Sequence, residues 1–120
     1  MFNGATSSVI FKIHRGNTTD VVYVRPSVLD GATIDANWSC KTAVVNTAGD
    51  VLVDTTTITA KSADDTEFKV YLTPTQTNAL NPDSGYQEYI WVVQLENTTL
   101  TPPIKRDIQF RLGVDIGNII

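Results

Sequence analysis

Short segments in which apolar and polar residues alternate recur along this chain of 120 residues. Ile108, Phe110 and Leu112, for example, are separated by single polar residues. A period of two is typical of a β-strand with one buried face. Seven such segments, divided by turn-forming residues, are predicted at 8–14, 18–25, 37–45, 51–58, 67–72, 86–96 and 104 to about 114.

One short helix is predicted to interrupt the strands, near residues 73–80. Thr73 and Gln76 have the spacing of a capping box, in which each side chain bonds the backbone N–H of the other residue. Pro74 stands at the first helical position, where its missing N–H costs no hydrogen bond. Asn81 and Pro82 are expected to end the helix.

These elements predict an all-β fold, an immunoglobulin-like antiparallel β-sandwich of about seven strands with the single helix near 73–80. A small β-barrel is the main alternative. The hydrophobic content of 42% is sufficient for a core, and the sequence contains no linker, repeat or low-complexity tract. Residues 1–120 are therefore expected to form one β-sandwich domain.

The charge and composition argue against several classes of protein. The chain has 9 basic and 13 acidic residues and a formal net charge of −4, without the basic patch that nucleic acid attracts. No apolar run approaches the roughly 20 residues of a membrane-spanning helix. No signal peptide is evident at the N-terminus, and Cys40, the only cysteine, excludes an internal disulfide. We expect folding in a reducing cytosol, with neither nucleic acid binding nor membrane insertion.

Residues capable of catalysis are scarce. His14 is the only histidine, and we expect it to be an ordinary side chain at a strand end. Cys40 is expected to be a small buried hydrophobic residue. The acidic residues at 64–67 offer oxygen atoms for calcium, but the EF-hand loop pattern is absent, so solvated loop charge is the favoured interpretation. We therefore predict no enzyme activity, no cofactor, no metal site and no catalytic residues.

The aromatic residues raise the alternative of a sugar-binding platform. Trp38 and Trp91 fall on the apolar faces of central strands, so core packing is favoured for both, whereas exposure of either would favour a glycan. Tyr23, Tyr71 and Tyr86 stand on the opposite faces beside charged residues, which leaves them available to a partner.

Two further features indicate assembly with other molecules. Ile90 and Val92 are apolar on the face opposite Trp91, and a strand that is apolar on both faces is covered on both, by its own chain or by a neighbour. The C-terminal residues 113–120 are also largely apolar, and they pack either against a neighbouring subunit or back on their own sandwich. The predicted interface residues are Tyr23, Tyr71, Ile90, Val92, Ile119 and Ile120.

Four stretches carry a resemblance to a known family. They are Arg15-Gly16-Asn17-Thr18 after the first strand, the Gly49-Asp50-Val51 hairpin, the capped segment at 72–80, and the Gly85-Tyr86 turn before a long strand. In these stretches the chain resembles the small immunoglobulin-like virion modules of tailed bacteriophages, of the type at the N-terminus of baseplate upper proteins. It departs from them in lacking the glycine that usually opens their last strand.

The resemblance implies a non-enzymatic virion structural protein, an assembly or adaptor module of the tail or baseplate. Its partners would be other virion proteins, including copies of itself, and it would reach the virion after folding in the host cytoplasm. A head (capsid) decoration or head-fibre protein is an alternative. A glycan-binding surface module, with a host-surface glycan as its partner, is the alternative from another class.

Overall fold

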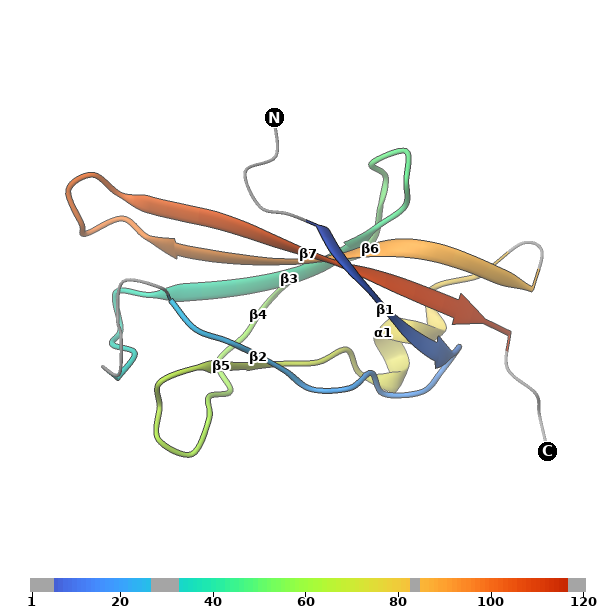
Figure 1. Cartoon of the computed structure of the whole chain (residues 1–120), viewed down its shortest axis with the longest axis horizontal. Helices are drawn as coiled ribbons and strands as arrows, with labels where there is room; N and C mark the ends of the chain where they lie inside the picture. Colours follow the sequence, from blue (N-terminus) through green and yellow to red (C-terminus); the bar gives the residue numbers. More distant parts are fainter. Residues whose placement is uncertain (1–5, 27–32, 83–84, 117–120) are drawn as a thin grey trace.

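The computed structural model describes residues 6–26, 33–82 and 85–116 of the chain. Its elements are arranged in two layers, with a long sheet over a smaller layer of strands and helix (Figure 1). The elements, in chain order, are β1 (Thr6–His14), β2 (Val22–Val24), β3 (Ser39–Val45), β4 (Val51–Thr57), β5 (Phe68–Val70), α1 (Pro74–Asn78), β6 (Tyr86–Asn97) and β7 (Ile104–Asp115).

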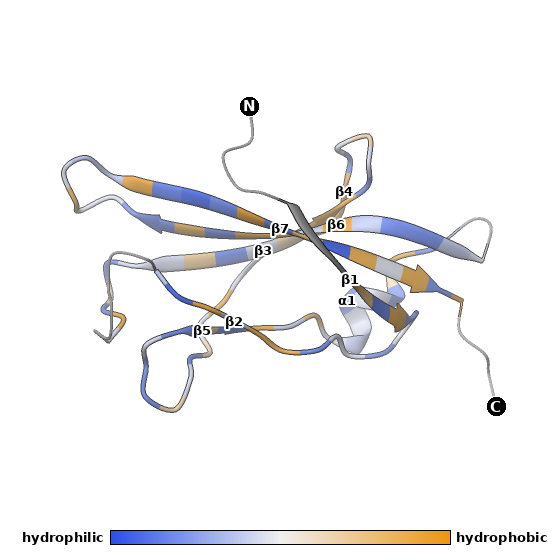
Figure 2. Cartoon of the chain, in the orientation of Figure 1, coloured by the Kyte–Doolittle hydropathy of each residue, from blue (hydrophilic) through white to orange (hydrophobic). Residues whose placement is uncertain are grey.

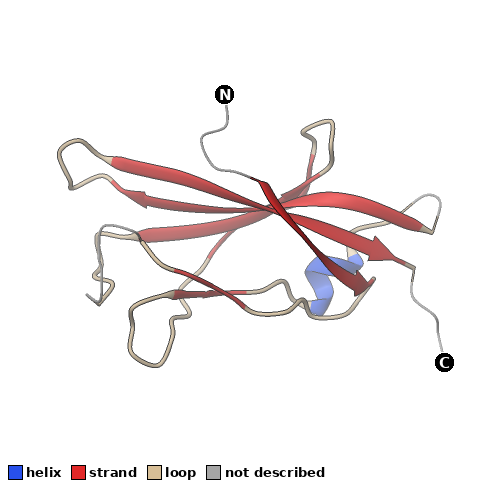
Figure 3. Cartoon of the chain, in the orientation of Figure 1, coloured by secondary structure: helices blue, strands red, loops and turns tan. Residues whose placement is uncertain are grey.

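The strands form a five-stranded sheet in the order β1-β7-β6-β3-β4 and a two-stranded sheet of β2 and β5. Figure 3 shows the helix in the second layer, below the five-stranded sheet. This architecture confirms the predicted all-β, sandwich-like fold. The larger sheet is mixed rather than wholly antiparallel, because β1 runs parallel to β7 while all the other pairs are antiparallel.

The core lies between the two layers and follows the predicted alternation. In β6 the odd-numbered residues from Tyr89 to Leu95 are buried, whereas the even-numbered residues between them are partly exposed. Figure 2 shows this mixture of hydrophobic and hydrophilic residues along the long strands. Phe11, Trp91 and Phe110 form an aromatic cluster with ring centroids 5.5 to 5.8 Å apart, which joins β1 to the centre of the sheet.

The segment predicted as a strand at 18–25 is ladder-paired over Val22–Val24 alone. Before this strand the backbone of Thr19 donates to the carbonyl of Leu72 at 3.1 Å, and its hydroxyl accepts from the Leu72 N–H at 2.8 Å. A buried threonine side chain thus replaces one rung of a β-ladder and anchors the segment without extending the strand.

The helix begins as predicted and ends earlier than predicted. The capping box is present, with the Thr73 hydroxyl accepting from the Gln76 N–H at 3.3 Å and the Gln76 amide oxygen accepting from the Thr73 N–H at 2.8 Å. α1 ends at Asn78 because the N–H groups of Ala79 and Leu80 bond to carbonyls three residues back, at 3.2 and 3.1 Å, which tightens the last turn.

Candidate interaction surface

The face of the five-stranded sheet that points away from the second layer carries a group of aliphatic side chains. The register places Ile90 of β6 opposite Val45 of β3, and Val45 opposite Val51 of β4, so that one row of branched residues crosses three strands. Val92 and Ala43 form the adjacent row. These five residues are called the outer patch; Val51 is 56% exposed and the other four are partly exposed.

The β3–β4 hairpin determines where the outer patch ends. The Asn46 side-chain oxygen accepts from the N–H groups of Ala48 and Asp50, at 3.0 and 2.9 Å, and Gly49 takes the positive φ of 92° that the loop needs. This closed loop holds β4 in register so that Val51 pairs with Val45. The hydrogen bonds and backbone conformation of this loop thus place Val51 in the aliphatic row.

Charged and polar pairs frame the outer patch. The Arg111 guanidinium donates two hydrogen bonds of 3.0 Å to the Glu88 carboxylate, and this pairing raises the pKa of Arg111. The Gln94 amide donates to the Asp107 carboxylate at 2.8 Å. An apolar centre with a polar rim is the usual anatomy of a protein–protein interface.

Tyr86 lies on the same face, and a glycine makes room for it. Gly113 of β7 is opposite Glu88, one register row away from Tyr86, and a Cβ atom at Gly113 would overlap the phenol ring. A glycine inside a strand often marks such a close approach. Tyr86, which the sequence places among the candidate contact residues, is 42% exposed, whereas no sequence pattern indicated the role of Gly113.

The predicted interface residues fall on more than one surface. Ile90 and Val92 lie together in the outer patch. Tyr23 is 51% exposed and Tyr71 is 37% exposed, but both belong to the second layer. Tyr71 lines a pocket of about 190 Å³ together with Gln76 of α1 and residues from the end of β4 and the segment after it. Ile119 and Ile120 lie outside the described residues.

The two tryptophans are in the core, as predicted. Trp91 has no exposed surface and its indole N–H donates to the Thr42 hydroxyl at 2.7 Å; Trp38 is buried as well. Neither side chain provides the exposed platform on which a sugar ring would stack.

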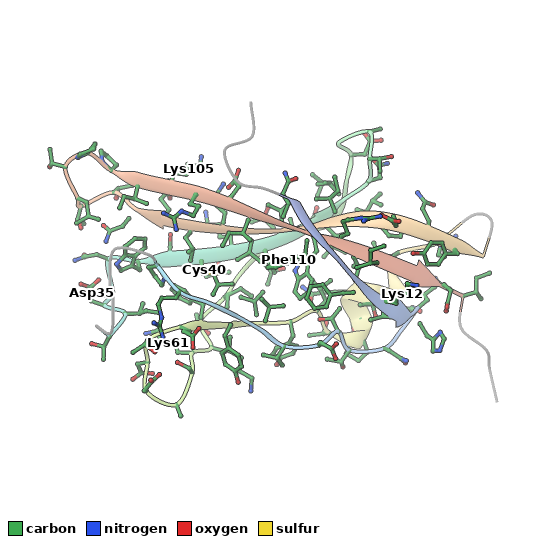
Figure 4. The ribbon with its side chains drawn as sticks, in the orientation of Figure 1. Lys12, Asp35, Cys40, Lys61, Lys105 and Phe110 are labelled. Atoms are coloured by element: carbon green, nitrogen blue, oxygen red, sulfur yellow. The ribbon has the colours of Figure 1, made fainter. Side chains whose placement is uncertain are left out.

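The two side chains that could take part in catalysis, His14 and Cys40, both have structural roles. The His14 ring Nδ1 and the Asp115 carboxylate form a hydrogen bond at the adjoining ends of β1 and β7. Cys40 of β3, labelled in Figure 4, is fully buried, and this burial raises the pKa of its thiol to about 12, far from the range of a nucleophilic thiolate. The predicted burial of Cys40 is confirmed.

The acidic loop before β5 is organised by its own hydroxyl groups. The Asp64 carboxylate accepts from the hydroxyls of Thr66 and Ser62, at 2.7 and 2.8 Å, and these hydrogen bonds lower its pKa. Over residues 6–26, 33–82 and 85–116, no three His, Cys, Asp or Glu side chains gather as a metal site would require. The same part of the chain contains no helix with the length and apolar character needed to cross a bilayer.

Three comparisons, with protein-family models, with curated proteins and with solved structures, found no match to this chain. The functional interpretation therefore depends on the residues and geometry described above.

Proposed function

We propose that this protein is a non-enzymatic structural protein of a bacteriophage virion, an assembly or adaptor module of the tail or baseplate. The observation that carries the proposal is the outer patch, in which Ile90, Val45 and Val51 form an aliphatic row on the side of the sheet that faces away from the second layer. A rigid sandwich with such a face can bind larger virion components non-covalently and hold them together or at a fixed spacing.

The resemblance of four sequence stretches to virion modules of tailed bacteriophages gives the proposal its biological setting. In that setting the partners are other virion proteins, including copies of this chain, and the protein joins the virion after folding in the host cytoplasm. Head decoration or a head-fibre role uses the same properties and is the alternative within this class.

The C-terminal segment is the second part of the proposed contact surface. Ile116, the last described residue, is 54% exposed, although its N–H bonds to the Gly85 carbonyl at 3.0 Å. Deletion of residues 116–120 is expected to abolish assembly and leave the melting temperature unchanged. A large loss of thermal stability would instead indicate that the segment packs on its own sandwich.

Immunogold labelling of phage particles, with antibody raised against this protein, tests the proposal directly. Label on the particles is expected, and its position on the head or the tail distinguishes the two structural roles. Unlabelled particles, with the protein free in the lysate, would overturn the structural role. They would favour a glycan-binding module, for which Tyr71 and its pocket are the remaining support.

A further inference from the structure

We propose that the outer patch is a surface through which two copies of this chain bind face to face. The inference deepens the proposed function, on which it rests for the outer patch as a contact surface, by naming a second copy as the occupant of that patch. Immunogold labelling tests the virion role and measurements on the purified protein test the pairing, so failure of one proposal can be distinguished from failure of the other.

The side chains of the outer patch suit packing of one sheet on another. Ile90, Val92 and Val45 are β-branched and present a ridge of methyl groups, with the small Ala43 beside Val92 as a recess. Two sheets pack face to face at about 10 Å when branched residues of this size interdigitate.

The edges of the same sheet are less suited to self-association than its face. The ladder of β4 with β3 shifts register twice, between Thr42 and Val44 and again between Val44 and Val45. The ladder of β1 with β7 also shifts, between Thr6 and Ile10. Irregularities of this kind at an edge strand discourage the addition of a further strand. Two copies are therefore expected to make contact through the outer face of the sheet and not through its edges.

The charges around the outer patch favour a second copy of this chain over a strongly charged partner. Eight charged side chains lie on this face in the register rows from Tyr86 to Glu96, and they comprise equal numbers of each sign. The cations are Lys12, Lys41, Lys105 and Arg111, and the anions are Glu88, Glu96, Asp107 and Asp115.

The charge balance of this face has a direct consequence for assembly. Because these eight charges cancel, the other 5 basic and 9 acidic residues carry the whole net charge of −4. Two copies that meet through the outer patch bring together faces of zero net charge, whereas the rest of the chain, taken together, is negative. Self-association through this face therefore meets no net charge repulsion.

Sedimentation velocity of the purified chain at concentrations from about 1 to 100 μM tests the proposal over the range in which a micromolar dimer forms. A species of twice the 13.1 kDa chain mass is expected to increase with concentration. The I90D variant is expected to weaken dimerisation by about 30-fold or more, as loss of an interface hot spot does. V51K, at an exposed edge position where misfolding is not expected, should weaken it as well.

The control is V21K, which changes a valine of similar chemistry that is 40% exposed in the segment leading to β2, in the second layer. Dimerisation of V21K should equal that of the unmodified chain. A monomer at all concentrations, or equal loss in V21K and V51K, would overturn the proposal.

A cysteine at position 92 gives an independent geometric test. Because Cys40 is buried and its thiol stays protonated, V92C would carry the one reactive thiol among the described residues. Oxidation at low protein concentration is expected to give a disulfide-linked dimer of V92C, and the same substitution at position 21 should remain monomeric. Equal cross-linking at both positions would contradict face-to-face pairing.

Discussion

Replacement of Thr42 by valine is expected to destabilise the fold, although strand propensity and hydrophobicity both predict the opposite. The Thr42 hydroxyl accepts from the Trp91 indole N–H at 2.7 Å and donates to the Val92 carbonyl at 2.9 Å. Trp91 has no exposed surface and Thr42 only 1%, so water cannot take the place of the hydroxyl. The substitution leaves a buried indole donor without a partner.

The magnitude follows from the groups left behind. A buried donor without an acceptor costs about 1–3 kcal/mol, and loss of the hydrogen bond to the Val92 carbonyl adds about 1 kcal/mol. Burial of a methyl group in place of the hydroxyl returns roughly 1 kcal/mol. Valine has nearly the same shape as threonine, so no cavity contributes. We expect a net loss of about 2 kcal/mol in the free energy of unfolding.

Urea unfolding followed by tryptophan fluorescence measures this loss, and circular dichroism checks that the variant is folded. T57V is the matched control, because Thr57 is also in a strand of the sheet but is exposed; its change should stay within about 0.5 kcal/mol. If T42V proves as stable as the unmodified protein, the hydrogen bond is not what determines the choice of threonine at this position.

Three further predictions concern other parts of the sandwich. The folded Cys40 thiol has a pKa of about 12, against 9.0 for the free group, so it should not react with thiol reagents near pH 8. Because the thiol of the unfolded chain ionises at lower pH than the folded one, the free energy of unfolding should fall by about 1.4 kcal/mol per pH unit above pH 9. The C40A variant should lack this pH dependence. T73A should lose about 1 kcal/mol in urea unfolding through loss of the capping box, whereas equal loss in T75A, at an exposed helical position, would refute the capping argument. G113A should be destabilised because its methyl group displaces the Tyr86 ring, and the same change in a Y86A background should cost little; equal costs in both backgrounds would show that the ring is not the cause.

The sequence predicts local features of this fold better than contacts between distant segments. The alternation in β6 and the capping box at Thr73 depend on neighbouring residues, and both agree with the structure. The parallel pairing of β1 with β7 joins residues about a hundred positions apart, and no local pattern indicates the direction of such a pair. The residues before β2 have the sequence pattern of a strand, but the Thr19 hydroxyl accepts a hydrogen bond from the Leu72 N–H. This contact depends on the tertiary structure and not on the local sequence.

In the candidate surface, too, local features could be predicted and contacts between strands could not. Ile90 and Val92 could be identified from the sequence, because a strand that is apolar on both faces is unusual on a solvated sheet. Their neighbours Ala43, Val45 and Val51 could not, since only the register across β6, β3 and β4 aligns them in rows.

The parallel pairing of β1 and β7 also determines how the module would respond to mechanical force. Because the two strands run in the same direction, the chain enters the pair at one end and leaves it at the other (Figure 1). Tension applied before β1 and after β7 pulls the strands past each other along their axes. The rungs from Ile10–Arg111 to His14–Asp115 then bear the load together, in shear, and do not open one by one as in peeling. A module built in this way would transmit tension along a chain while its sandwich stays closed.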